Sequence, residues 1–107
     1  MSHKVVQPTE LLDGISANQL RREITDVMAE GVKTILVDLQ DVSFMNSSAI
    51  GALVATLKAV RAGGGEMVLC SLHDQVRIIF ELTKMDQIFK IYADRQEFEQ
   101  KSAVSAS

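Results

Sequence analysis

The chain alternates between two kinds of apolar pattern, and this alternation limits the folds that it can adopt. Thr34–Leu39 and Glu66–Ser71 are largely apolar, which is typical of strands buried on both faces. Between such runs, apolar residues recur every three or four positions, which predicts amphipathic helices. The predicted elements, in chain order, are a strand at 4–7, a helix at 17–30, a strand at 34–39, a helix with an apolar stripe from Ile50 to Val60, a strand at 66–71, a helix with a stripe from Val76 to Phe80, a strand at 88–92 and a helix at 94–100.

Strands that alternate with helices imply right-handed crossovers and a parallel sheet. We therefore predict an α/β fold with a central, mostly parallel or mixed sheet of about four strands and about four helices packed on it. The 107 residues suffice for one domain, which we place at 1–101, followed by a flexible tail of small residues at 102–107. The side chains expected in the core are Ile35, Val37, Leu39, Leu53, Leu57, Val68, Cys70 and Phe80.

Local signals predict where the helices begin and end. Ser16 and Gln19 have the spacing of a capping box, which predicts a helix start close to Ala17. Gly31 suits the C-terminal cap of that helix. The three glycines at 63–65 precede a strand, whereas a phosphate-binding loop follows a strand and opens a helix, so they predict a helix stop with a tight turn. Residues 40–43 predict a polar turn, and the third helix could extend to Leu82.

Charge and length exclude several classes of protein. The net charge is −3 and no stretch concentrates Lys and Arg, so we expect no direct binding to nucleic acid. No apolar run approaches the roughly 20 residues of a membrane span, and the first residues form no apolar signal segment. We therefore expect a cytoplasmic protein with no membrane contact. Cys70 has no second cysteine to pair with, and His3 and His73 are far apart in sequence, so we expect no metal site.

No group of residues has the spacing of a catalytic site. The carboxylates of Asp38, Asp41 and Glu66 are not spaced as an acid–base pair. Cys70 lies within an apolar strand, where a thiol usually acts as a small core hydrophobe. His73 lies at a predicted helix start, where we expect a solvated capping residue. We therefore expect no catalytic residue, no cofactor and no enzymatic activity.

The segment 44–51, Phe-Met-Asn-Ser-Ser-Ala-Ile-Gly, is the most informative part of the chain. Its three small polar residues lie where a loop becomes a helix, and one of them is enough to cap the first free N–H groups. Two further amide or hydroxyl groups then remain without a structural role. Gly51, in the first turns of the helix, costs roughly 1 kcal/mol relative to Ala. These features leave two interpretations open, an ordinary helix cap and a helix start that binds a partner.

At this point the sequence resembles the STAS domains and, among them, the bacterial anti-sigma factor antagonists. The resemblance covers about residues 11–92, and its most specific block is 41–51, Asp-Val-Ser-Phe-Met-Asn-Ser-Ser-Ala-Ile-Gly. Further matching segments are Leu12-Asp13, 35–39, 64–70 and 76–80. In that family, a partner that is both an anti-sigma factor and a serine kinase phosphorylates the first serine of the pair, which corresponds to Ser47.

The resemblance implies a regulatory protein that binds this kinase when unphosphorylated and is released when phosphorylated on Ser47. It also implies a cognate phosphatase and a chain that is a monomer or a weak homodimer. The residues that it implies for partner binding are Asp13, Phe44, Asn46, Ser48, Ala49, Ile50 and Gly51.

The sequence departs from the family pattern at three places. Asn46 stands where the family has Asp, and Ala49 stands where it has Gly. Before Leu12-Asp13 the chain has room for one short strand where family members usually have two, which predicts a sheet with a less protected edge. Ser48 is expected to support the helix start and not to be the main phosphate acceptor.

Two other functions remain open at this stage. The first is a STAS scaffold or ligand-sensing module that works without phosphorylation, which the loss of the family Asp at position 46 favours. The second, much weaker, is a small enzyme, for which no nucleophile–base pair is found.

Overall fold

The computed structural model describes residues 3–8 and 10–106, with side chains described at all of these positions except 10, 11 and 102–106. The elements, in chain order, are β1 (His3–Val6), β2 (Glu10–Leu12), α1 (Gly14–Ala29), β3 (Thr34–Asp38), β4 (Val42–Met45), α2 (Ser47–Ala62), β5 (Glu66–Cys70), α3 (Asp74–Leu82), a 3-10 helix η1 (Met85–Gln87), β6 (Ile91–Tyr92) and α4 (Arg95–Ala106).

The central sheet has four parallel strands in the order β1-β3-β5-β6. Its two middle strands are in register, with Ile35 opposite Met67 and Val37 opposite Leu69. This confirms the predicted α/β class. A second, two-stranded sheet joins β2 to β4, also in parallel.

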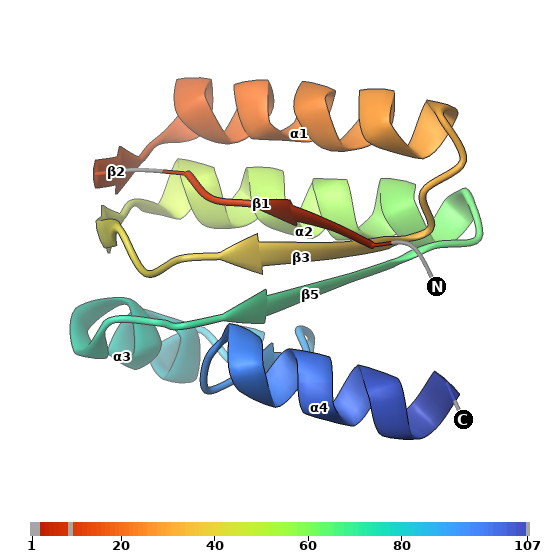
Figure 1. Ribbon diagram of the computed structural model, residues 1–107. Helices are drawn as coiled ribbons and strands as arrows, with labels where there is room; N and C mark the ends of the chain where they lie inside the picture. Colours follow the sequence, from red (N-terminus) through yellow and green to blue (C-terminus); the bar gives the residue numbers. More distant parts are fainter. Residues whose placement is uncertain (1–2, 9, 107) are drawn as a thin grey trace.

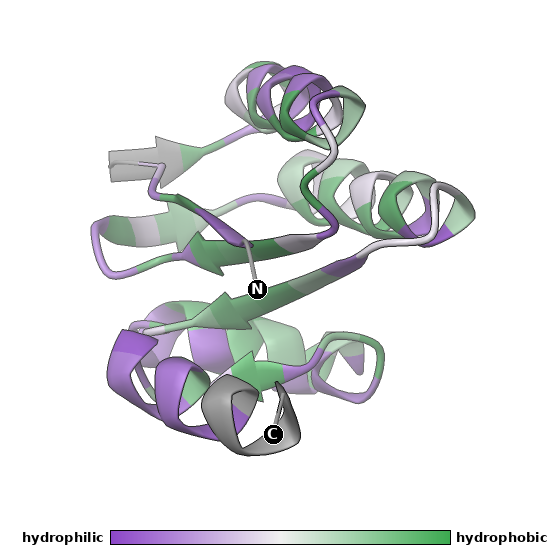
Figure 2. Cartoon of the chain, turned by 45° about the vertical axis from the view of Figure 1, so that its right-hand side comes forward, coloured by the Kyte–Doolittle hydropathy of each residue, from purple (hydrophilic) through white to green (hydrophobic). Residues whose placement is uncertain are grey.

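Helices cover both faces of the central sheet (Figure 1). On one face α1 and α2 pack against Ile35, Val37 and Leu69 of the two middle strands. On the other face Phe98 of α4 packs with Leu36, Val68 and Tyr92 among others. Side chains alternate between the faces along a strand, so apolar residues at every position fill both layers. Figure 2 shows β3 and β5 as largely hydrophobic ribbons, whereas hydrophilic residues gather in α1 and α4. All eight predicted core residues are buried.

The prediction for the segment before α1 is wrong in one respect. Two strands precede Asp13, where the sequence predicted room for one. The second of these strands, β2, pairs with β4, and the first two residues of β4 fall within the polar turn that was predicted at 40–43. Only three residues of β2 lie in the ladder, and its partner is about thirty positions away in sequence, so no local pattern indicates either strand.

The last third of the chain also differs from the prediction. The strand predicted at 88–92 is reduced to Ile91 and Tyr92, because the N–H groups of Ile88 and Phe89 bond back to the Met85 carbonyl of η1 in a turn. Leu82 does not join the core, since its side chain is 78% exposed. Helix α4 extends to Ala106, past the helix predicted at 94–100. The flexible tail at 102–107 stays a prediction, and residue 107 lies outside the described residues. Within residues 3–8 and 10–106, no helix is long and apolar enough to cross a membrane.

Candidate functional site

Helix α2 begins at the segment that the sequence analysis singled out. Strand β4 ends at the buried Met45, and Asn46 follows in an extended conformation with φ −92° and ψ 174°. The Asn46 Oδ1 atom accepts a hydrogen bond of 2.9 Å from the backbone N–H of Ala49. The Asn46 carbonyl accepts the first helical bond from the N–H of Ile50, at 3.2 Å. Asn46 is therefore the N-cap, and its amide oxygen supplies the acceptor that a carboxylate would supply without adding a charge.

Ser47 and Ser48 are the first two residues of α2, and both are exposed. Because Asn46 makes the cap, neither hydroxyl is needed there. Within the described part of the chain, neither hydroxyl makes a hydrogen bond. Ser47 is thus exposed at the start of α2, as the sequence predicted.

The N-terminus of α1 lies directly beside that of α2. The backbone N–H of Asn46 donates a 3.2 Å hydrogen bond to the carbonyl of Leu12. Two residues further along each segment, Gly14 is so close to Ser48 that a Cβ atom at position 14 would lie 3.3 Å from the Ser48 Cβ. These two contacts lie on either side of Asp13 in one segment and of Ser47 in the other. The starts of α1 and α2 therefore adjoin, with Asp13 just before the first residue of α1 and Ser47 as the first residue of α2.

Asp13 is the N-cap of α1. Its Oδ1 accepts hydrogen bonds from the Ser16 N–H at 2.9 Å and from the Ser16 hydroxyl at 3.1 Å, and the Ser16 Oγ accepts one from the Asp13 N–H at 3.0 Å. The hydrogen bond from the Ser16 backbone is the main reason that the pKa of Asp13 lies below its ordinary value. The capping box predicted for Ser16 and Gln19 is therefore wrong. The box joins Asp13 to Ser16, and the helix begins three residues earlier, at Gly14.

The surface around Ser47 is uncharged and partly apolar. No residue from Val42 to Leu57 is charged. Two large apolar side chains are exposed here, Phe44 on β4 at 49% and Ile15 on α1 at 74%. Of the residues predicted for partner binding, Phe44, Ser48 and Gly51 are exposed, and Asp13 and Asn46 are half-buried. Ala49 and Ile50 are buried, so their side chains pack beneath this surface.

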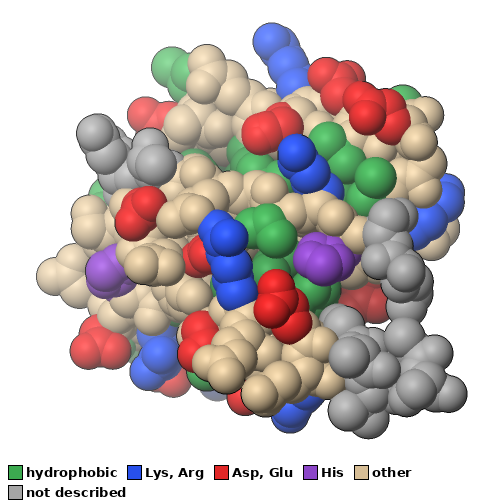
Figure 3. All heavy atoms as spheres, in the orientation of Figure 1, with side chains coloured by type: hydrophobic (Ala, Val, Ile, Leu, Met, Phe, Trp, Pro, Cys, Tyr) green, Lys and Arg blue, Asp and Glu red, His purple; other side chains and the backbone are tan. Residues whose placement is uncertain are grey.

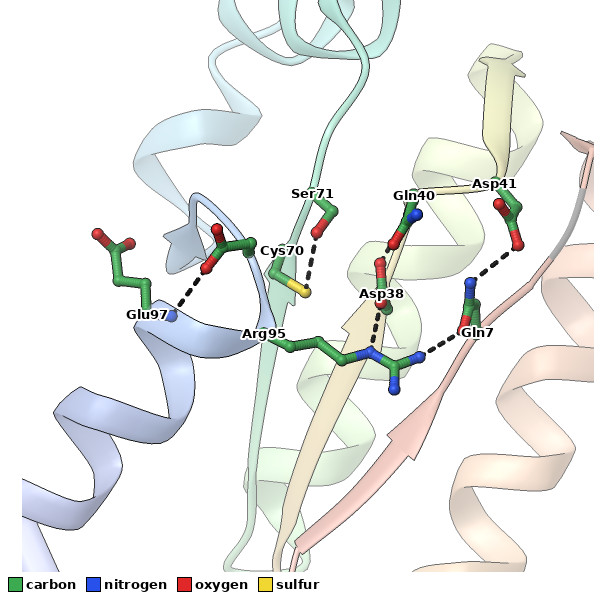
Figure 4. A network of polar contacts seen from close by, with 9 residues as sticks. Gln7, Asp38, Gln40, Asp41, Cys70, Ser71, Arg95 and Glu97 are labelled. Carbon is green, nitrogen blue, oxygen red and sulfur yellow. Dashed lines mark hydrogen bonds and ion pairs between the residues drawn. The ribbon is translucent and has the colours of Figure 1, made fainter.

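A second polar cluster, which the sequence analysis did not identify, lies where β1 and β3 end (Figure 4). Asp38 is completely buried, and its Oδ2 atom lies 2.5 Å from Nε of Arg95 in α4. The other carboxylate oxygen accepts a 2.9 Å hydrogen bond from the backbone N–H of Gln40. Arg95 also donates to the side-chain carbonyl of Gln7, whose amide donates to Asp41 at 2.8 Å. We call these five residues the Asp38–Arg95 network; an aspartate at the end of an apolar strand was its one sequence signal.

The remaining candidate groups from the sequence have structural roles. Burial raises the pKa of the Cys70 thiol to about 11, so the group stays protonated and unreactive near neutral pH. His73 precedes α3 but makes no side-chain cap, which corrects the predicted capping role. Its Nε2 atom hydrogen bonds to the carbonyl of Gln40. In the described residues, no three His, Cys, Asp or Glu side chains are grouped as a metal site would require.

Charges elsewhere on the surface are dispersed. On the face drawn in Figure 3, basic and acidic side chains are interspersed, and the described residues of that face form no basic patch. This is the arrangement expected of a chain with a net charge of −3.

The chain belongs to the STAS domain family, because the family model for the STAS domain matches residues 2–98. Among proteins with assigned functions, it is 29% identical over 80 residues to the anti-sigma-B factor antagonist of Staphylococcus aureus. That match covers 75% of this chain and 74% of the relative.

Solved structures show the same relationship. Protein TM1081 of Thermotoga maritima is 28% identical, with a TM-score of 0.81 over 91% of this chain and 84% of that one. The anti-sigma factor antagonist SpoIIAA, in its unphosphorylated form, has a TM-score of 0.75 over 94% of this chain and 90% of its own. At 20% identity, the likeness to SpoIIAA shows the fold alone.

Proposed function

We propose that this chain is an anti-sigma factor antagonist that acts in the cytoplasm by switching partners. In its unmodified form it binds an anti-sigma factor that is also a serine kinase, and the sigma factor held by that partner is released. Phosphorylation of Ser47 ends the binding, and a phosphatase restores it. The role is one of binding and regulation and not of catalysis. The named relatives support the partner class, since the S. aureus relative is an anti-sigma-B factor antagonist.

The observation that carries the proposal is the state of Ser47. Its side chain is exposed at the start of α2, and Asn46 alone makes the cap, so modification of Ser47 breaks no hydrogen bond of the fold. A helix N-terminus is also a favourable place for a negative group, because its free N–H groups point outward. The fold can therefore accept a phosphoryl group without rearranging, and the new charge acts on the partner.

The size of the charge effect is sufficient for a switch. A dianion about 4 Å from an acidic group of the partner costs several kcal/mol at an intermediate dielectric constant. Because each 1.4 kcal/mol corresponds to roughly a tenfold change in Kd, such a contact abolishes binding at cellular concentrations. Because no residue between Val42 and Leu57 is charged, phosphorylation changes the local charge of this surface from about zero to strongly negative.

Calorimetry with a co-encoded serine kinase tests the proposal. We expect Ser47→Asp to weaken binding at least tenfold, and Ser47→Ala to bind as the unmodified chain does but to incorporate no phosphate. A matched control is Ala55→Asp, which adds the same charge at an exposed position about two turns further along α2. This control should bind normally, and thermal melts should show that all three variants are folded.

Two results together would overturn the switch. They are tight binding by Ser47→Asp and the absence of phosphate at Ser47 with every co-encoded kinase. The phosphorylation-independent scaffold or ligand-sensing module would then be the better description of this chain.

A further inference from the structure

The position of Asp13 has a consequence for the modified protein. The Leu12–Asn46 hydrogen bond and the Gly14–Ser48 contact hold the starts of α1 and α2 together, so Asp13 and Ser47 lie at adjoining helix ends. We infer that Asp13 and phosphorylated Ser47 form an electrostatically coupled pair, in which the charge on one group sets the ionisation of the other. This inference rests on the proposed phosphorylation of Ser47 and adds a pH dependence to it.

Asp13 is ionised near neutral pH and is held in place. Its carboxylate is fixed by the N–H and the hydroxyl of Ser16, and these bonds favour the charged form. A phosphoryl group at Ser47 would therefore meet a negative charge that is already fixed by the cap of α1.

Among the described residues, Asp13 has no other charged group acting on its ionisation. The pKa of Asp13 is set by hydrogen bonds from Ser16, Ile15 and its own backbone and by partial burial, and no charged side chain contributes to it. The elements beside it, β4 and the first eleven residues of α2, contain no titratable or charged residue between Val42 and Leu57.

The two helix N-termini and Asp13 act on the phosphate in opposite directions. The second ionisation of a phosphoserine has a pKa of about 6, so it titrates within the physiological range. The free N–H groups of α2 favour the dianion and lower that pKa. The Asp13 carboxylate disfavours the dianion and raises it. Asp13 therefore keeps the phosphate group monoanionic in a larger fraction of the modified protein between about pH 6 and 7. Release of the partner consequently becomes less complete as the pH falls.

The test uses protein with phosphoserine installed at position 47 during synthesis, so that no kinase is needed. Titration followed by ³¹P NMR should give a lower second pKa in the Asp13→Asn variant than in the chain with Asp13. Asparagine can still cap α1, so the fold is expected to persist. The matched control is Asp26→Asn, which removes an exposed aspartate of the same helix more than three turns away and should leave the phosphate pKa unchanged. The difference caused by Asp13→Asn should shrink in high salt.

A reciprocal measurement requires no substitution. The coupling of two ionisations is symmetric, so the pKa of Asp13, followed by carboxyl NMR, should rise when Ser47 is phosphorylated. An unchanged Asp13 pKa, or equal phosphate pKa values in all three chains, overturns the inference. If instead the coupling is measured but no cellular kinase modifies Ser47, the proposed function fails and the coupled pair stands.

Discussion

Two polar regions lie at the end of the molecule where the strands finish and α1 and α2 begin, and they are built in opposite ways (Figure 1). The Asp38–Arg95 network is charged and centres on a fully buried carboxylate whose two oxygens are both bonded. The start of α2 is uncharged and exposed, and its serine hydroxyls are unbonded within the described residues.

The difference follows from the energetics of burial. A buried charge without partners is strongly destabilising, so a buried polar group is retained only where the fold bonds it fully. At the surface, water solvates a hydroxyl, and the group can stay unbonded at little cost. Removal of one partner from the network should therefore destabilise the fold, whereas the exposed serine hydroxyls can be changed at little cost. Substitutions in the two regions should accordingly affect different properties.

The largest effect on stability is expected from Arg95→Ala, because it leaves the carboxylate of Asp38 buried without its cation. We expect the free energy of unfolding to fall by about 3 kcal/mol, measured by urea denaturation. The control is Arg77→Ala, which removes an exposed pair with Asp74 and should change stability by less than about 0.5 kcal/mol. Equal effects of the two substitutions would show that the network does not stabilise the fold.

The next effect is expected from the cap of α2. Asn46→Ala removes the acceptor of the Ala49 N–H and should destabilise the protein by about 1 kcal/mol in the same measurement. Asn46→Asp keeps an acceptor at this position and should be at least as stable as the unmodified chain. If Asn46→Ala had no effect, one of the two serines would be able to replace the cap, and the hydroxyl of Ser47 would not be free.

A smaller, pH-dependent effect is expected from Asp13. Its pKa is lower in the folded protein than in the unfolded chain, mainly because of the Ser16 N–H. The ionised carboxylate thus contributes stability that is complete above the unfolded pKa of about 4 and is lost as the pH falls through the lower, folded value. Unfolding measured across this range should show a shallower loss of stability for Asp13→Asn. An identical pH profile in both proteins would contradict the role of the Ser16 bond.

The smallest effect is expected from Ser48→Ala. The Ser48 hydroxyl is exposed and makes no hydrogen bond in the described chain, so stability should change by less than about 0.5 kcal/mol. Phosphate incorporation with the native kinase, measured by intact mass, should remain at one group per chain. Loss of that group in Ser48→Ala alone would assign the modification to Ser48 in place of Ser47.

Much of this fold could be predicted because the relevant signals are local. The apolar runs at 34–39 and 66–71 are buried strands, as predicted, and the stripe from Ile50 to Val60 forms the inner face of α2. Gly31 and Gly64 adopt positive φ values beyond the helix ends, where glycine has no Cβ penalty. The capping box of α1 was misplaced because Ser16 fits two positions, N-cap and N3, and only the backbone conformation of Asp13 distinguishes them.

The sequence by itself determined the α/β class and the helix start that presents Ser47, because period, cap and turn preferences depend on residues close together in the chain. The tertiary structure decided three further features. They are the pairing of β2 with β4, the adjoining starts of α1 and α2, and the ion pair between Asp38 and Arg95, which are 57 positions apart. Each of these features joins two segments whose amino-acid sequences do not indicate that they are neighbours in the fold. They form only when the packing of the helices on the sheet brings the segments into contact. Closing such long loops costs chain entropy, and burial of the shared apolar core offsets that cost, whereas the polar contacts themselves do not.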